Sequence, residues 1–312
     1  MKIRGRESGG VSGSDEVGRA KLAPGKAPDV SPGKFTNGTL CTAFFISILF
    51  LVTSPCLASL PDHPLIEFAK QKEGQRVRYA LDNGAQVGLT ADGKSYYVLW
   101  LPEGTDPQNP PPMIATMHGH DGCAFTDFYV WHHFVKERGY GLLAIQWWLG
   151  GGEDIRDYLL PNEVYRAMDD VFRKLKIAPG AAMLHGFSRG SANIYAVAAL
   201  DRSLHKDYFS LFVANSGQVN SNYPPIHEIE TGRFGEQPFL GTHWVTYAGE
   251  KDVNPDRDGV RAMRKTGEWI KKYAGTIDLA IEDPEGGHGG FHLRPQNCEK
   301  ALDVFEKLRF RS

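Results

Sequence analysis

A glycine-flanked serine follows a buried strand. Residues Gly186-Phe187-Ser188-Arg189-Gly190 come after an apolar stretch that ends at His185, and small residues typical of a helix follow them. The glycines permit a sharp turn that lifts the serine hydroxyl above a sheet, and the helix N-terminus behind it offers amide donors. The pattern predicts that Ser188 is a nucleophile; the alternative is a structural glycine turn that contains a serine by chance.

A serine hydroxyl needs a histidine base, and the histidine needs a carboxylate that orients it. Both are expected later in the chain, in the order Ser, Asp, His, at the ends of further strands. Asp252 follows the predicted strand 243–248, and His288 follows the predicted strand 277–281. We therefore predict that Ser188, Asp252 and His288 work together.

Each of the two partners has a rival nearby. Glu250 follows its strand immediately, whereas Asp252 lies further round the turn. His292 is a second candidate base, but His288 has a glycine pair on either side, which lets its loop arch over the serine. These spacings favour Asp252 and His288 over Glu250 and His292.

Acyl transfer also requires donors for a developing oxyanion. A His-Gly pair, His118-Gly119, follows the predicted strand 113–117, where such a pair commonly turns an amide toward the nucleophile. We predict that the backbone amides of His120 and Arg189 are the donors. Because main-chain groups would do this work, the side chains of His120 and Arg189 should matter less than that of Ser188.

A metal site is the competing interpretation of the histidine-rich stretch. Residues His118, His120 and Asp121 resemble the pattern H-x-H-x-D-H, but Gly122 and Cys123 stand where that pattern needs Asp and His. No second cluster of ligating residues compensates for the mismatch. We expect no metal and no other cofactor.

Substrate contacts are expected from the loop after the predicted strand 142–147. Trp147 or Trp148 could stack on a sugar or an aromatic acyl group, although tryptophans packed in the core at a strand end are the alternative. Glu153 could recognise a substrate amine, and a solvated acidic turn is the alternative there. These three residues are the candidate substrate contacts.

Apolar runs and helical patterns alternate along residues 59–312. Residues 75–102 contain two turn signals and end in Tyr96–Leu101, which predicts antiparallel strands at the start. Strands and helices that alternate in this way predict one α/β domain whose mixed, mostly parallel sheet is covered by helices on both faces. Further predicted strands are 113–117, 142–147, 182–185, 211–214, 243–248 and 277–281, and further predicted helices are 125–138, 162–178, 191–200, 258–273 and 296–308.

The first 58 residues do not read as part of that domain. Residues 1–39 are basic and rich in Gly, Ser and Pro, so they are expected to be a disordered tail. Residues 40–58 hold a short apolar core and end in a small residue, which is typical of a secretory signal peptide. An uncleaved membrane anchor and a misassigned start are the alternatives. The protein is expected to be secreted or periplasmic, and membrane-bound only if residues 40–58 stay attached.

The amino-acid composition limits the classes of binding partner that we expect for this protein. Lys plus Arg (35) and Asp plus Glu (37) nearly balance, with a formal net charge of −2, so no basic excess attracts a nucleic acid. Beyond the first 58 residues only Cys123 and Cys298 remain; they could form a disulfide or stay separate buried thiols. The oligomeric state stays open.

These residues together resemble the α/β-hydrolase superfamily, most of all its secreted esterase, polyhydroxyalkanoate depolymerase, and dienelactone hydrolase or prolyl-oligopeptidase-like groups. The resemblance rests on His118-Gly119, Ser188, the turn from Gly249 to Asp252 and His288. It implies a serine hydrolase that cleaves small-molecule or polymeric carboxylic esters through an acyl-enzyme. A serine peptidase of the same fold and a catalytically silent binding protein are the alternatives.

Overall fold

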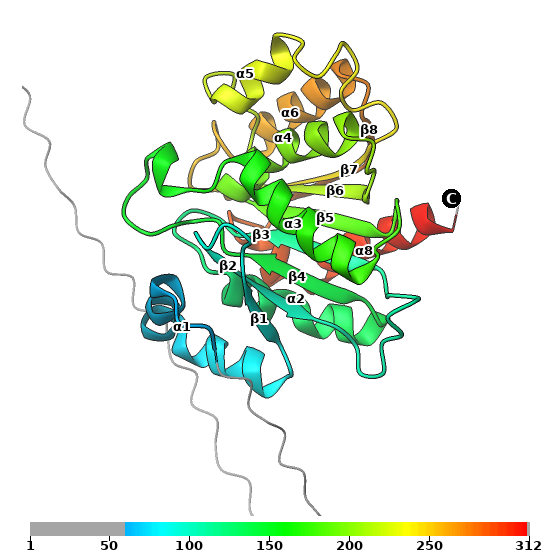
Figure 1. Ribbon diagram of the computed structural model, residues 1–312. Coiled ribbons are helices and arrows are strands. Elements are labelled where there is room, and N and C mark those ends of the chain that lie inside the picture. Colours follow the sequence, from blue (N-terminus) through cyan, green and yellow to red (C-terminus); the bar gives the residue numbers. More distant parts are fainter. Residues whose placement is uncertain (1–59, 311–312) are drawn as a thin grey trace, which may run out of the picture. The chain divides into compact units, whose positions relative to one another are not determined.

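The computed structural model describes residues 60–310, which form an eight-stranded sheet flanked by helices (Figure 1). The strand order is β1-β2-β4-β3-β5-β6-β7-β8. β2 runs antiparallel to both of its neighbours, and all other neighbouring strands are parallel. The predicted mixed, mostly parallel sheet is therefore confirmed. The strands are β1 (Gln86–Leu89), β2 (Tyr96–Trp100), β3 (Met113–Met117), β4 (Gly141–Ile145), β5 (Ala182–Phe187), β6 (Phe209–Asn215), β7 (His243–Gly249) and β8 (Thr276–Asp283).

The helices divide between the two faces of the sheet. One apolar core lies beneath α3, α4 and α6, and a second lies beneath α1, α2 and α8 (Figure 1). A sheet covered on both faces is what the parallel strand order predicts. The helices are α1 (Pro64–Asp82), α2 (Ala124–Arg138), the 3₁₀ turn η1 (Ile155–Asp157), α3 (Pro161–Leu175), α4 (Arg189–Ser203), α5 (Pro224–Glu230), α6 (Val260–Lys272), α7 (Gly290–Leu293) and α8 (Pro295–Arg309).

The central strands supply both cores from alternate residues. In β3, Met113, Ala115 and Met117 belong to one core, whereas Ile114 belongs to the other. Successive side chains of a strand point to opposite faces, so a strand buried on both sides is apolar at most positions, as β3 is apart from the buried Thr116. This is why β3 coincides with the predicted strand 113–117.

The N-terminal part of the domain differs from the prediction. Residues 75–82, expected to open the antiparallel strands, belong to helix α1 instead. The buried face of α1 consists of Ile66, Ala69, Val77 and Ala80, and the helix is interrupted at Glu73, which has non-helical backbone angles. Because no apolar residue lies on this face between Ala69 and Val77, the amphipathic pattern is weak and the sequence does not reveal the helix.

The start of α3 also differs from its predicted position. The helix was predicted over residues 162–178, but its N-cap is Leu160 and Pro161 is the first helical residue. Proline suits this position because it has no N–H, and an N–H at the first helical residue would find no acceptor inside the helix. The carboxylate of Glu163 accepts a hydrogen bond of 2.8 Å from the backbone N–H of Leu160.

Cys123 and Cys298 are free, buried thiols. Both belong to the core beneath α1, α2 and α8. Burial raises the pKa of each thiol. Of the two possibilities that the sequence left open, the structure shows the separate thiols.

The predicted tail (1–39) and signal segment (40–58) lie outside the described residues. Among the helices of residues 60–310, none has the length and apolar character required to cross a bilayer.

Asp127 is an ionisable group buried in α2. Burial raises the pKa of its carboxyl from 3.8 to about 7. The folded chain therefore binds this proton more tightly than the unfolded chain, so the free energy of unfolding falls as the pH rises from about 4 to about 7. We expect Asp127→Asn to raise Tm by at least about 2 °C at pH 8 and by less at pH 5, as measured by thermal unfolding.

The exposed Asp62 offers the matched control. Asp62→Asn should leave Tm nearly unchanged at both pH values, because its carboxyl stays hydrated in the folded chain. A gain for Asp127→Asn that is as large at pH 5 as at pH 8 would contradict this account of the buried carboxyl.

Candidate active site

Ser188 lies at the sharp turn between β5 and α4. Its backbone has φ 53° and ψ −115°, a left-handed conformation that costs a non-glycine residue about 1–3 kcal/mol. The backbone N–H of Ser188 donates a hydrogen bond of 2.8 Å to the carbonyl of Asn215 at the end of β6. The neighbouring strand thus holds the strained turn in place.

The glycines on either side of Ser188 are required by close packing. A Cβ at Gly186 would lie 2.6 Å from the carbonyl oxygen of Gly190, and a Cβ at Gly190 would lie 2.2 Å from the carbonyl oxygen of Met117. Both distances are far below van der Waals contact, and both neighbours are main-chain atoms. Only glycine therefore lets α4 approach β3 and β5 this closely.

A third glycine, which the sequence analysis did not single out, supports the same turn. A Cβ at Gly217 would lie 2.0 Å from the carbonyl oxygen of Ser188. The carbonyl of Gly217 accepts hydrogen bonds from Ser191 Oγ (3.0 Å) and Tyr195 Oη (2.7 Å) on α4. These bonds hold the end of β6 against the first turns of α4. The signal in the sequence was a Ser-Gly pair, Ser216-Gly217, one residue beyond the predicted strand 211–214.

The structure brings Ser188, His288 and Asp252 into one hydrogen-bonded chain. His288 Nε2 lies 2.8 Å from Ser188 Oγ, and His288 Nδ1 lies 2.8 Å from Asp252 Oδ2. A carboxylate only accepts, so Nδ1 carries the proton and Nε2 is free to accept the proton of the serine hydroxyl. The side chain of Asp252 is fully buried, and that of His288 is 24% exposed.

Main-chain bonds tie the loop of Asp252 to the loop of His288. The N–H of Glu250 donates to the carbonyl of Asp283, and the N–H of Lys251 donates to the carbonyl of Gly286, both at 2.9 Å. Because neither loop can move without breaking these bonds, the distance from Asp252 to His288 is held by the backbone.

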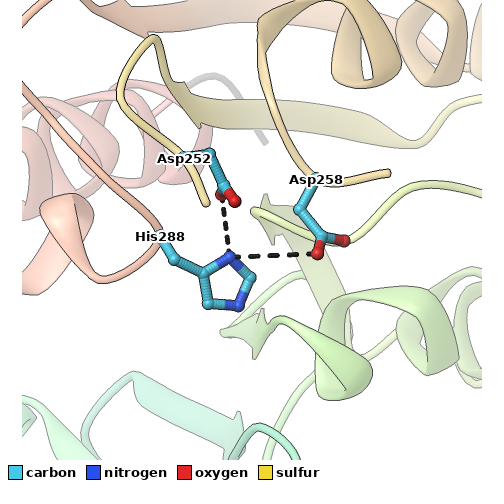
Figure 2. Close-up of side chains that lie close together, drawn as sticks. All are labelled: Asp252, Asp258 and His288. Atoms are coloured by element: carbon cyan, nitrogen blue, oxygen red, sulfur yellow. Dashed lines mark hydrogen bonds and ion pairs between the residues drawn. The ribbon is translucent and has the colours of Figure 1, made fainter. Parts of the chain in front are cut away.

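A second carboxylate, absent from the sequence prediction, approaches the same ring nitrogen. Asp258 Oδ2 lies 4.0 Å from His288 Nδ1, and Figure 2 shows both carboxylates on that side of the ring, with Nε2 pointing away. Burial raises the pKa of Asp258, although a 2.7 Å hydrogen bond from Arg257 Nε opposes this. The sequence carried one signal for Asp258, its place in the loop that already contains Asp252.

These three side chains are also of types that bind metal ions. Among residues 60–310, the ligating atoms of Asp252, Asp258 and His288 lie within 4.8 Å of one another. His288 Nδ1 carries the proton that it donates to Asp252. This proton occupies the position that a metal ion would take on Nδ1. The geometry fits an oriented imidazole.

The residues of the competing metal pattern bind other partners. His118 is buried and lies within bonding distance of a main-chain carbonyl, and burial lowers its pKa to about 4. His120 Nδ1 lies 2.8 Å from the hydroxyl of Tyr158, whereas Asp121 forms an ion pair with Lys72.

The rivals for base and acid lie elsewhere. His292 packs its ring against His185 and Trp131, with ring centroids 4.8 Å and 6.0 Å away. Burial lowers the pKa of His292 to about 4. Glu250 is exposed to solvent. Neither side chain takes part in the hydrogen-bonded chain to Ser188.

One predicted amide donor, Arg189, directly follows the serine in the chain, and the segment that leads to the other, His120, passes close to it. Arg189 is the first residue of α4, so its N–H has no partner within the helix. A Cβ at Gly119 would lie 3.3 Å from Ser188 Cβ, which shows how closely the segment before His120 passes the serine. His120 and Arg189 line the same cleft as Ser188.

The cleft around Ser188 has a volume of about 400 Å³, and a side pocket of about 280 Å³ shares Glu153, Arg189, Ala192 and Asn220 with it. Trp147 is almost wholly buried but lines the side pocket. Trp148 packs instead against Phe68, in a T-shaped contact at 5.4 Å. Of the three predicted substrate contacts, the structure therefore brings Trp147 and Glu153 to the site.

The solved structures most similar to this chain include several esterases. No protein-family model and no curated protein matches the sequence. A fungal esterase structure from Rhizomucor miehei matches with a TM-score of 0.56 and 15% identity, over 80% of this chain and 92% of that chain. An esterase/lipase from an uncultured bacterium gives 0.54 and 15%, over 81% and 94%. Esterase 2 from Thermogutta terrifontis, with butyrate bound, gives 0.52 and 15%, over 73% and 94%. The chain thus has the α/β-hydrolase fold.

Gly190 allows a direct test of the packing beneath the serine. We expect Gly190→Ala to lower Tm by at least about 4 °C, because its Cβ would meet a main-chain carbonyl that cannot move without shifting β3. Gly74→Ala is the matched control, since no atom lies within 4 Å of the added Cβ. Equal Tm values for the two variants, measured by thermal unfolding, would show that the close approach is not required.

Proposed function

We propose that the chain is a serine hydrolase that cleaves carboxylic esters through an acyl-enzyme. The observation that carries this proposal is the chain of two 2.8 Å contacts from Asp252 through His288 to Ser188. Support comes also from the fold, which is shared with structures described as esterases. Small-molecule and polymeric esters are both candidate substrates.

The first half of the reaction forms the acyl-enzyme. Ser188 Oγ attacks the ester carbonyl carbon while its proton passes to His288 Nε2. The backbone amides of Arg189 and His120 stabilise the oxyanion. When the tetrahedral intermediate collapses, the bond to the alcohol oxygen breaks, and the imidazolium donates its proton to the leaving alcohol.

The second half releases the acid. Water attacks the acyl carbon and gives its proton to His288 Nε2, and the bond to Ser188 Oγ then breaks as the proton returns to the serine. Asp252 holds the ring in the required tautomer throughout. Asp258 adds a second negative charge 4.0 Å from the ring, which favours the imidazolium that forms in both halves.

An ester fits this site better than a peptide whose free amine is recognised by Glu153. The carboxyl group of Glu153 is 76% exposed and lies 3.3 Å from His120 Nε2. An exposed carboxylate that already contacts an imidazole is not a preformed amine site. Ester and anilide substrates distinguish the two reactions: hydrolysis of aminoacyl-p-nitroanilides alone would favour the peptidase.

A second part of the proposal concerns export of the protein. We propose that residues 40–58 act as a signal peptide, so that the domain acts outside the cytoplasm; an uncleaved anchor is the alternative. N-terminal sequencing of the protein recovered from the producing cells distinguishes cleavage after Ala58 from retention of the segment.

Removal of the nucleophile gives the most direct test of the reaction. We expect Ser188→Ala to lower kcat for p-nitrophenyl ester hydrolysis by at least about 10⁴-fold and to abolish labelling by a fluorophosphonate probe. His120→Ala, which keeps the proposed amide donor, should cost far less. Wild-type protein that is folded but neither labelled nor active on esters would instead favour a catalytically silent binding protein.

The two carboxylates near His288 should differ in their effects. We expect Asp252→Asn to lower kcat/KM by about 10³–10⁴-fold, because the asparagine can stabilise the wrong tautomer. Asp258→Asn should cost about tenfold or less and shift the acid limb of the kcat/KM profile to lower pH, since a charge that favours the protonated ring is removed. A pH profile of Asp258→Asn that coincides with that of the wild type would exclude this role for Asp258.

A further inference from the structure

The side pocket next to Ser188 has room for one ring-sized group. Its volume of about 280 Å³ is at the lower limit of typical small-molecule sites, which hold about 300–1,000 Å³. It adjoins the cleft of Ser188, because Arg189 and Glu153 line both. A group bonded to the ester near Ser188 can therefore extend directly into it.

Asn193 provides a buried hydrogen-bond donor in this pocket. The residue is 1% exposed, and its Oδ1 accepts a 2.8 Å hydrogen bond from the hydroxyl of Tyr223. Its Nδ2 has no partner among the described residues. A buried donor without an acceptor is unfavourable, and a ligand oxygen that reached Asn193 Nδ2 from the pocket would remove this cost.

Arg189 supplies further donors on the same side of the pocket. It precedes Asn193 by four residues on α4, so the two side chains lie on one face of the helix. Its guanidinium stacks over the ring of Tyr158 at 4.6 Å, and its Nη1 donates to the carbonyl of Glu153 at 2.8 Å. Since a guanidinium has five N–H donors, others remain for a ligand.

The rest of the lining combines aromatic surface with one acceptor. Trp147, Tyr158 and Tyr223 contribute rings, and the carboxylate of Glu153 contributes acceptor oxygens. The positive charge of Arg189 and the negative charge of Glu153 offset each other, so neither an anionic nor a cationic group is singled out.

Hydroxyl groups on a ring satisfy all of these features at once. A hydroxyl both donates and accepts, which matches Asn193, Arg189 and Glu153, and the apolar face of a sugar ring packs against aromatic side chains. An alkyl chain in the same pocket would leave Asn193 Nδ2 unpaired.

We infer that the side pocket binds a single sugar ring and that the substrate is an acylated sugar whose sugar hydroxyl is the alcohol of the ester. This inference rests on the proposed esterase reaction. Attack by Ser188 breaks the bond between the acyl carbon and the sugar oxygen, and that oxygen leaves with the proton from His288.

The test compares esters that differ only in ring chemistry. Monoacetylated methyl glucoside, galactoside and xyloside are measured against cyclohexyl acetate, which has a ring without hydroxyl groups. We expect kcat/KM of the wild-type full-length chain to be at least tenfold higher for one or more of the sugar acetates. A preference for cyclohexyl acetate over all three sugars overturns the inference.

Two variants test whether a preference for sugar acetates arises in the side pocket. We expect Asn193→Leu to reduce the ratio of the sugar to the cyclohexyl kcat/KM at least tenfold, whereas the exposed Asn162→Leu should leave the ratio unchanged. A general folding fault would lower both rates together, so an unchanged ratio in Asn193→Leu counts against the pocket.

A measurement on the wild-type chain does not depend on the folding of any variant. The parent methyl glycoside of the preferred acetate should inhibit p-nitrophenyl acetate hydrolysis competitively, and absence of inhibition at 100 mM would overturn the inference. If the wild type cleaves no ester and takes up no fluorophosphonate, the esterase proposal itself fails. Ester hydrolysis without sugar preference refutes the sugar pocket alone.

Discussion

The strained backbone of Ser188 is the constraint on which the rest of the site depends. A left-handed non-glycine residue persists only where its surroundings hold it, and here the carbonyl of Asn215 accepts its N–H while Gly190 lets α4 pack against β3. The same turn begins α4 directly after the serine, so the amide of Arg189 is available beside the hydroxyl. The position of the Ser188 hydroxyl and that of the Arg189 amide are therefore set by one feature of the backbone.

Much of this arrangement follows from the sequence. Parallel strands end at the same edge of a sheet, so polar residues in the loops after predicted strands are expected to meet, as Ser188, Asp252 and His288 do. The apolar runs of β3 to β7 were recognisable because these strands are buried on both faces. The order of the strands and the positions of their ends thus predict contacts between residues that lie 100 positions apart in the sequence.

The features that the sequence did not reveal depend on contacts rather than on patterns. The buried face of α1 has no apolar residue between Ala69 and Val77, so its helical pattern is weak in the sequence. Asp258 acquires its position from the path of a loop, and nothing in its local sequence distinguishes it from a solvated aspartate. Asn193 lies in an alanine-rich helix, where only the absence of a partner for its amide, after folding, marks it as unusual.

The two unpaired thiols have a consequence for where this domain can fold. Cys123 and Cys298 are buried in the hydrophobic core as free thiols, and their raised pKa values keep them in the unreactive thiol form at neutral pH. The described domain, residues 60–310, therefore contains no bond that requires an oxidant to form.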